Sequence, residues 1–220
     1  MLAQFPNPFS VAMIQGRDPP LLKRENCSLV FCDLVDYDSL SCALPPGSLF
    51  DLLRRLFAQL DLLAALHGVQ AIDTNGGCYL AATNYLSAQP RDHATRLAAF
   101  TLAALAAASA LPIDPLRPEL GPVRPRAGLH CGAVCGSVLG ARGGRKHTLV
   151  GAAVNVASRM QTHGAAGAAQ CSAAFAGALR REAGAAGGGG AGAVAVPREG
   201  GVVAKGLGRV ETYWVVPGRA

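Results

Sequence analysis

Two short strand-like runs meet at Asn75-Gly76 in the segment VQAIDTNGGCYLAAT. Asn-Gly between such runs is the strongest short-range signal for a two-residue hairpin turn, because that turn needs residues that accept a positive φ. A long amphipathic helix is predicted just before the hairpin. Leucines recur at helical spacing from Ser48, where Asp51 three residues later suggests a capping box, and Gly68 follows as a stop signal. A helix that leads into an antiparallel hairpin indicates an α+β fold.

The neighbouring segments continue this alternation of helix and strand. CSLVFCDLV, residues 27–35, is an apolar run typical of a buried central strand, with Asp33 towards its end. Residues 91–111 are rich in alanine and predict a second helix that packs closely against a sheet or another helix. RAGLHCGAVCGSVLG, residues 126–140, predicts two strands with a turn near Gly132. We therefore expect an α+β sheet covered by helices on one face.

The second half of the chain is richer in glycine. GARGGRKHT, residues 140–148, predicts a flexible basic connection to a short helix in GAAVNVASRM, which Gly164 ends. Residues 173–200 are mostly alanine and glycine, with GGGG at 187–190, and predict a mobile low-complexity loop. No fixed-period repeat is present in the sequence.

Length and composition suit one domain. The 220 residues, half of them hydrophobic, can bury a core without disulfides or a structural metal. We place the domain at residues 27–216, between an N-terminal extension of residues 1–26 and a tail of residues 217–220.

Charge and cysteine usage indicate where such a domain works. Seven cysteines form an odd set without a CxxC pair, which favours a reducing cytosol and a cytoplasmic location. The net charge of +6 is dispersed, so we expect solvated surface and no nucleic-acid partner. The first 20 residues do not form a signal peptide, and the apolar run at 97–113 is short for a membrane span. We expect no membrane segment in this chain, although a larger membrane-associated signalling protein could contain it.

Five segments in order carry a resemblance to a known family. They are LVFCDLVDYDSL, GVQAIDTNGGCYLAAT, RAGLHCGAVCGSVLG, RKHTLVGAAVNVASRM and VVAKGLGRVETYWV, and together they cover roughly residues 27–216. Their sequence and order resemble the catalytic domains of class III nucleotidyl cyclases, the adenylyl and guanylyl cyclases. The resemblance implies a ferredoxin-like, palm-like antiparallel sheet with helices. It also implies conversion of a nucleoside triphosphate into a cyclic nucleotide and pyrophosphate, in intracellular signal transduction.

The catalytic set that the resemblance implies is complete. Asn155 and Arg159 lie one helical turn apart, so an amide and a permanent cation share one helix face. In the family, the Asn orients the ribose and the Arg stabilises the transition state. Lys205 in VAKGLG matches the lysine that binds the triphosphate tail, a role suited to a flexible ammonium.

The metal site that the resemblance implies is incomplete. Class III cyclases hold two divalent ions, Mg²⁺ or Mn²⁺, on two aspartates. Asp33 matches the first aspartate, with the backbone carbonyl of Leu34 beside it. The second belongs to a hairpin that runs close to TIGDAYM, and TNGGCYL places Gly77 there, without a ligand atom. Asp36 and Asp38 are nearby acids that could substitute, although they are better explained as exposed loop residues.

Base recognition rests, by resemblance, on Asp73 and Thr148. An ionised carboxylate only accepts hydrogen bonds, so Asp73 suits the N1–H and N2–H of guanine and opposes the lone pair on adenine N1. The hydroxyl of Thr148 can serve either base. The pair favours GTP over ATP and cGMP over cAMP.

Two weaker signals favour ordinary structure. His130, Cys131 and Cys135 could form a metal site, but they fall on the predicted hairpin. GARGGRK could cradle a phosphate, but it lacks the GK[ST] ending of a P-loop.

Three functions remain open at the level of sequence. Family members build each active site across a homo- or heterodimer, with the aspartates on one protomer and the Asn, Arg, Lys and base-recognition residues on the other. The first function is therefore a cyclase subunit that needs a partner with both aspartates, because of Gly77. The alternative is a catalytically inactive nucleotide-binding or regulatory module. The third, an active homodimer with an unusual metal ligand, has the least support.

Overall fold

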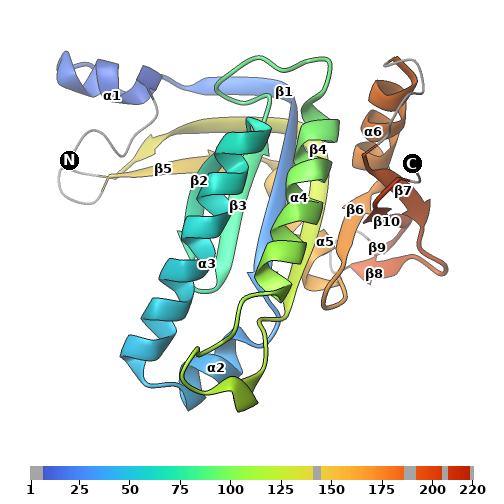
Figure 1. Ribbon diagram of the computed structural model, residues 1–220. Helices are drawn as coiled ribbons and strands as arrows, with labels where there is room; N and C mark the ends of the chain where they lie inside the picture. The colour runs from blue at the N-terminus through green and yellow to red at the C-terminus, as the bar shows by residue number, and fades with distance from the viewer. Residues whose placement is uncertain (1–6, 141–144, 186–191, 205–207, 219–220) are drawn as a thin grey trace.

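The computed structural model describes residues 7–140, 145–185, 192–204 and 208–218. Their main feature is an eight-stranded sheet in the order β2-β3-β1-β4-β6-β10-β7, in which β5 also pairs with β4 (Figure 1). Its strands are β1 (Leu22–Leu34), β2 (Gln70–Asn75), β3 (Cys78–Thr83), β4 (Pro125–Leu139), β5 (Lys146–Val150), β6 (Ala169–Ser172), β7 (Val194–Pro197) and β10 (Thr212–Val216). A separate two-stranded sheet joins β8 (Val202–Ala204) to β9 (Gly208–Val210).

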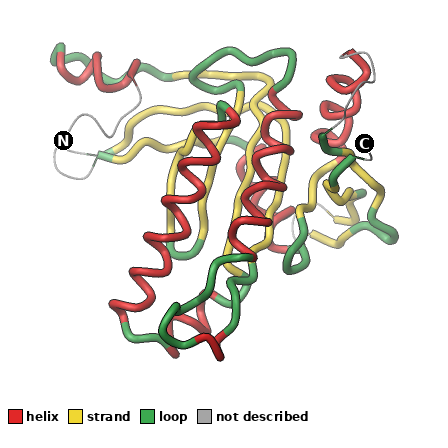
Figure 2. Tube along the Cα trace, in the orientation of Figure 1, coloured by secondary structure: helices red, strands yellow, loops and turns green. Residues whose placement is uncertain are grey.

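Helices lie on both faces of the sheet, not on one face as expected from the sequence. The helices are α1 (Asn7–Ile14), α2 (Tyr37–Ala43), α3 (Pro46–His67), α4 (His93–Ser109), α5 (Ala152–Thr162) and α6 (Ala173–Ala185). Helices α3 and α4 run side by side over one face (Figures 1 and 2), where Leu56 and Leu97 pack with Val30 of β1. Helix α5 covers the opposite face, where Ala157 packs with Leu29. Alternate residues of β1 therefore enter two different cores.

Strand β1 is central, since it pairs antiparallel with β3 on one side and with β4 on the other. This double pairing places Asp33 directly between Cys78 and Arg126. Gly128 of β4 allows α5 to lie close to the sheet, because a Cβ at this position would overlap the backbone nitrogen of Gln161. The end of α5 is thereby brought next to the end of β1.

The hairpin expected around Asn75-Gly76 forms one residue later. Asn75 is the last residue of β2 and pairs with Cys78, so Gly76 and Gly77 make the turn. Gly76 has a φ of 56°, whereas the backbone of Asn75 does not enter the positive-φ region. Gly76 takes the first turn position, which Asn75 was expected to take, and Gly77 takes the second.

One helix start and one strand start differ from the sequence-based expectations. Helix α3 begins at Pro46 without a side-chain cap, and Asp51 pairs with Arg54 and Arg55 instead of forming a capping box. Strand β1 begins at Leu22, five residues before the start expected at residue 27.

The turn expected near Gly132 is absent, because residues 125–139 form one continuous strand, β4. A Cβ at Gly132 would stand 3.1 Å from the Cβ of Ala153. The glycine therefore leaves room for α5 to pack against the strand and does not reverse the chain.

The alanine- and glycine-rich stretch at 173–200 is largely ordered, contrary to the mobile loop expected there. Ala173–Ala185 form α6, and Val194–Pro197 form the edge strand β7. Phe175 and Leu179, one helical turn apart, are buried in the main core and fix the helix. Residues 186–191, with the GGGG run, and residues 141–144 of the basic connection lie outside the described residues.

Candidate functional site

Three donor groups converge on one oxygen of Asp33. Its Oδ2 atom accepts hydrogen bonds from Nε of Arg126 at 3.0 Å, Nη2 of Arg126 at 2.8 Å and Nε2 of Gln161 at 2.6 Å. The side chains of Asp33 and Arg126 are 15% and 21% exposed. A carboxylate in this position is neutralised within its own chain by a two-donor ion pair and an amide.

The partners of Asp33 come from the fold and not from neighbouring sequence. Arg126 is the cross-strand partner of Asp33 on β4, and Gln161 stands at the end of α5. Neither residue was identified from the sequence. The contact of Gln161 with Asp33 could not be predicted from the sequence, because the sequence does not show which face of α5 packs on the sheet.

The position expected to hold the second metal-binding aspartate is occupied by the turn itself. A Cβ at Gly77 would stand 2.7 Å from Cδ2 of Tyr37. The backbone N–H of Leu34 donates to the carbonyl of Gly77 at 3.3 Å, which ties the end of β1 to the hairpin. The carboxylate of Asp36 pairs with Arg124 at 2.9 Å, and Asp38 is exposed in the first turn of α2.

These contacts do not fit a pair of divalent cations. One of the two carboxylate oxygens of Asp33, Oδ2, already receives three donors, and Gly77 offers no side-chain ligand. Across the described ranges, no group of three or more His, Cys, Asp or Glu side chains could hold a metal ion. Hard divalent cations take about six oxygen ligands, and Asp33 with the carbonyl of Leu34 would supply only a few of them.

Helix α5 presents different residues to two directions. Ala153, Ala157, Met160 and Gln161 are buried against the sheet. Asn155 is exposed and Arg159 is partly exposed. Within the described part of the chain, neither of these two side chains has a hydrogen-bond or ion-pair partner. The structure thus keeps Asn155 and Arg159 together but does not bring them onto Asp33. Lys205 lies outside the described residues.

Asp73 and Thr148 line one cavity of about 290 Å³ between the β2-β3 hairpin and β5. Both oxygens of Asp73 have partners: Oδ2 lies 2.8 Å from Nζ of Lys146, and Oδ1 accepts the N–H of Thr74 at 2.9 Å. Asp73 is 32% exposed and Lys146 is 57% exposed, so both can still meet a ligand. Lys146 was not identified from the sequence. Its place two residues before Thr148 on a strand, hence on the same face, is the signal that could have found it.

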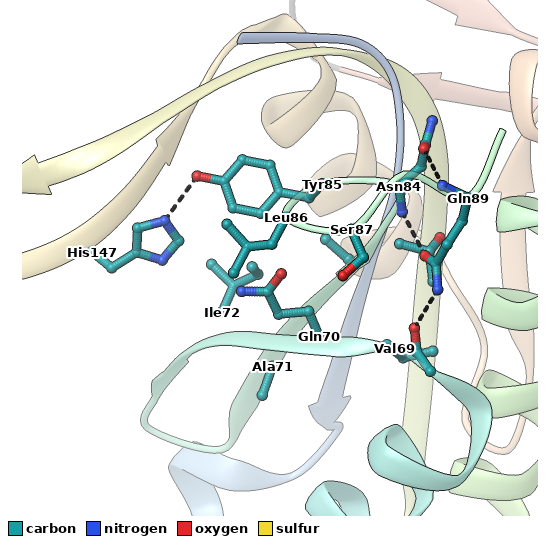
Figure 3. Close-up of a pocket in the computed structure, with 13 residues that line it drawn as sticks. Val69, Gln70, Ala71, Ile72, Asn84, Tyr85, Leu86, Ser87, Gln89 and His147 are labelled. Atoms are coloured by element: carbon teal, nitrogen blue, oxygen red, sulfur yellow. Dashed lines mark hydrogen bonds between the residues drawn. The ribbon is translucent and has the colours of Figure 1, made fainter. Parts of the chain in front are cut away.

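A second cavity, of about 460 Å³, adjoins this one, and Ile72 and His147 line both (Figure 3). The hydroxyl of Tyr85 and Nε2 of His147 are hydrogen-bonded at 2.9 Å, and the ring of Phe9 lies 4.9 Å from that of His147. Burial lowers the pKa of His147, partly opposed by Asp73, so the ring is neutral near pH 7. The described residues that line the second cavity carry no charged side chain, so it does not suit a triphosphate.

The histidine and cysteines of β4 have structural roles. Nδ1 of His130 is hydrogen-bonded to Oγ of Ser172 on β6 at 2.7 Å, and burial lowers its pKa to about 4. Burial raises the pKa of the Cys131 thiol, which keeps it protonated. Because no metal-binding group forms among the described residues, these side chains are packing and hydrogen-bonding residues of the sheet.

Comparison with known proteins gives consistent matches. The family described as adenylate and guanylate cyclase catalytic domain matches residues 21–217, close to the start of β1. Guanylate cyclase soluble subunit beta-2 of Rattus norvegicus is 26% identical over 216 residues, which is 98% of this chain and 30% of that protein. The chain therefore spans less than a third of this relative.

Solved structures agree with the sequence matches. The guanylate cyclase domain of RhGC from Catenaria anguillulae, solved in complex with GTP, superposes with a TM-score of 0.78 at 26% identity, covering 90% of this chain and 99% of that one. A guanylyl cyclase domain of the RhoGC fusion protein from Blastocladiella emersonii, described as a non-canonical dimer, gives a TM-score of 0.73 at 25% identity, over 89% and 98% of the two chains. Within the residues that the structure describes, no helix is long and apolar enough to cross a membrane.

Proposed function

Because this chain belongs to the family of adenylate and guanylate cyclase catalytic domains, we propose that it supplies the base- and ribose-binding half of a nucleotidyl cyclase active site. A partner protomer with both metal-binding aspartates supplies the other half. The substrate is a nucleoside triphosphate, and the products are a cyclic nucleotide and pyrophosphate. Mg²⁺ or Mn²⁺, which cyclases of this class use, would be held by the partner's aspartates.

One observation carries this proposal: among the described residues, Asn155 and Arg159 on the outer face of α5 have no hydrogen-bond or ion-pair partner, while Gln161 on its inner face donates to the carboxylate of Asp33. Asn155 and Arg159, two residues of the half that would serve another protomer, are thus free to meet a nucleotide. The half that would hold metal in this chain is neutralised by its own side chains. In the assembled site, the amide of Asn155 would orient the ribose, and the guanidinium of Arg159 would stabilise charge that develops on the α-phosphate.

The Asp73–Lys146 pair supports GTP as the preferred substrate. The carboxylate accepts from the N1–H and N2–H groups of guanine, and the ammonium donates to O6. Adenine presents the opposite pattern, an acceptor at N1 and a donor at N6. The hydroxyl of Thr148 can donate or accept and therefore does not select a base. Lys146 only donates, and so favours the O6 acceptor of guanine.

Mixing experiments test the proposal. The isolated chain should form little cyclic nucleotide from GTP with Mn²⁺. Addition of a cyclase protomer that has both aspartates but lacks its own Asn and Arg should restore turnover. Arg159→Ala should then lower that turnover by about 10² or more, the size expected for a group that stabilises transition-state charge. Arg54→Ala, at an exposed arginine of α3, is the matched control. Rescue that survives Arg159→Ala would contradict the proposal.

A second function is favoured by the contacts of Asp33 alone. A domain whose metal-binding carboxylate is held by Arg126 and Gln161 could bind nucleotide and regulate a partner without catalysis. This function predicts calorimetric binding of a non-cyclisable GTP analogue with no turnover in any mixture. A cytoplasmic location within a larger signalling protein suits both functions.

A further inference from the structure

The Asp33 cluster joins three elements of the fold. Asp33 is the residue before the last in β1, Arg126 is the second residue of β4, and Gln161 belongs to the last turn of α5. The guanidinium of Arg126 also donates through Nη1 to the carbonyl of Thr162 at 3.3 Å. Arg126 thus connects the carboxylate of Asp33 to the C-terminal end of α5, where helix carbonyls lack intrahelical partners.

A cation at this point would have to replace favourable contacts. On Oδ2 it would compete with Arg126 and Gln161, and on either oxygen of Asp33 it would lie beside the guanidinium of Arg126. Gly77 adds no negative charge to offset that repulsion, and the ring of Tyr37 fills the space where a side chain would start. Removal of the carboxylate, in contrast, would leave a largely buried cation and an amide without their acceptor.

We infer that Asp33 in this chain is not a metal ligand but an internal counter-ion that positions α5. It holds the inner face of the helix through Arg126 and Gln161, and so fixes the direction in which Asn155 and Arg159 point. The part of this inference that concerns Asn155 and Arg159 rests on the proposed function. The part that concerns the metal and the helix does not.

The metal arm of the test uses Mn²⁺ alone, titrated into the full chain and followed by electron paramagnetic resonance. The proteins compared are the wild type, Asp33→Asn and the control Asp36→Asn, which removes an exposed carboxylate from a similar pair with Arg124. We expect the three binding curves to coincide up to about 1 mM Mn²⁺, a concentration at which weak carboxylate sites become occupied. Loss of one bound Mn²⁺ per chain in Asp33→Asn alone would overturn the inference.

The positioning arm follows hydrogen exchange of the backbone amides in residues 152–164. Asp33→Asn should speed their exchange by about tenfold or more, because the helix loses its inner anchor, whereas Asp36→Asn should not change it. Asp33→Glu, which keeps the charge, should restore part of the protection and also serves if Asp33→Asn does not fold. Equal exchange in wild type, Asp33→Asn and Asp33→Glu would overturn the positioning role.

The activity arm uses mixed dimers and separates kcat from KM. Asp33→Asn should lower kcat per bound nucleotide by about tenfold, because a displaced Arg159 loses alignment with the reacting phosphate. KM should stay within about twofold, because the residues proposed to meet the base, Asp73, Lys146 and Thr148, belong to β2 and β5, and α5 contributes only the apolar Val154 to the cavity lining. An unchanged kcat would contradict the positioning role. Absence of turnover in every mixture would instead contradict the proposed function. The Mn²⁺ titration and the hydrogen exchange would then test the role of Asp33 without it.

Discussion

The ring of Tyr37 lies over Gly77 so closely that a Cβ at residue 77 would stand 2.7 Å from its Cδ2 atom and 2.9 Å from its Cγ atom. These are ring atoms near the backbone, not the end of a flexible chain. An aspartate at residue 77 therefore requires the ring of Tyr37 to move. Gly77→Asp alone would disturb this packing as well as add a carboxylate.

The first prediction concerns this pair. Gly77→Asp alone should destabilise the hairpin and give little turnover. Gly77→Asp with Tyr37→Ala should raise turnover of the isolated chain with Mn²⁺ and GTP by at least about tenfold, equivalent to roughly 1.4 kcal/mol of barrier. The added carboxylate supplies the negative charge that the wild type lacks, which would allow a cation to replace Arg126 and Gln161 at Asp33. Tyr37→Ala alone is the control and should remain inactive. A substantial wild-type rate that the double variant leaves unchanged would show that the second carboxylate is not what the site lacks.

The second prediction concerns base preference. GTP should bind better than ATP, measured by calorimetry with non-cyclisable analogues. Lys146→Met should lower the ratio of GTP affinity to ATP affinity by about tenfold, since a hydrogen bond to a charged group contributes about 1.5–3 kcal/mol. Asp73→Lys with Lys146→Met should reverse the order, because the remaining ammonium only donates and can satisfy adenine N1. Equal binding of both nucleotides in all three proteins would place Asp73 and Lys146 outside the base site.

The third prediction concerns His130 and pH. Burial holds its folded pKa at about 4, below the value of roughly 6.5 in an unfolded chain. The unfolded state thus binds a proton first as pH falls, so stability is complete above about pH 6.5 and decreases towards pH 4. His130→Asn keeps a partner for Ser172 but cannot titrate. The loss of unfolding free energy between pH 7 and pH 5 should be smaller in this variant, by on the order of 1 kcal/mol; denaturant curves with equal pH dependence would rule this out.

The fourth prediction concerns Glu182 of α6, which caps the start of α4. Its carboxylate accepts the N–H groups of Ala94 at 3.1 Å and Thr95 at 2.8 Å, and it is 9% exposed. Glu182→Ala should lower the free energy of unfolding by about 1–3 kcal/mol, because two helix N–H groups lose their acceptor. Glu199→Ala, at an exposed glutamate, should change it by less than about 0.5 kcal/mol. Similar melting temperatures for the two variants would contradict the capping role.

Local patterns in the sequence were sufficient to predict the elements with a regular apolar stripe or an unbroken apolar run. The leucine spacing of α3 and the apolar run of β1 predicted a helix and a central strand, and the structure contains both. Glycine-rich segments were interpreted wrongly, because glycine has two uses that the sequence does not separate. In β4 it permits close approach of α5, and in α6 Phe175 and Leu179 stabilise a helix by tertiary burial despite weak local signals.

The candidate site divides in the same way. Motif resemblance identified Asp33, Asp73, Thr148 and Asn155 with Arg159, and the structure places Asp73 with Thr148 in one cavity. Arg126 and Gln161 could not be found in this manner, because their relation to Asp33 depends on strand register and on the depth at which α5 packs. The charge of Asp33 is neutralised by residues of β4 and α5 that meet the end of β1 only in the folded chain, so no single sequence motif predicts it.

The two faces of α5 also have a consequence for stoichiometry. A pair of identical chains would contain two outward Asn-Arg sets and no pair of aspartates, so we expect it to contain no complete site. A mixed pair would contain one complete site, since the partner's aspartates meet one Asn-Arg set only. Its product would then rise linearly with the number of mixed pairs, saturation by substrate would follow a simple hyperbola, and an excess of this chain would increase output only until every partner is occupied.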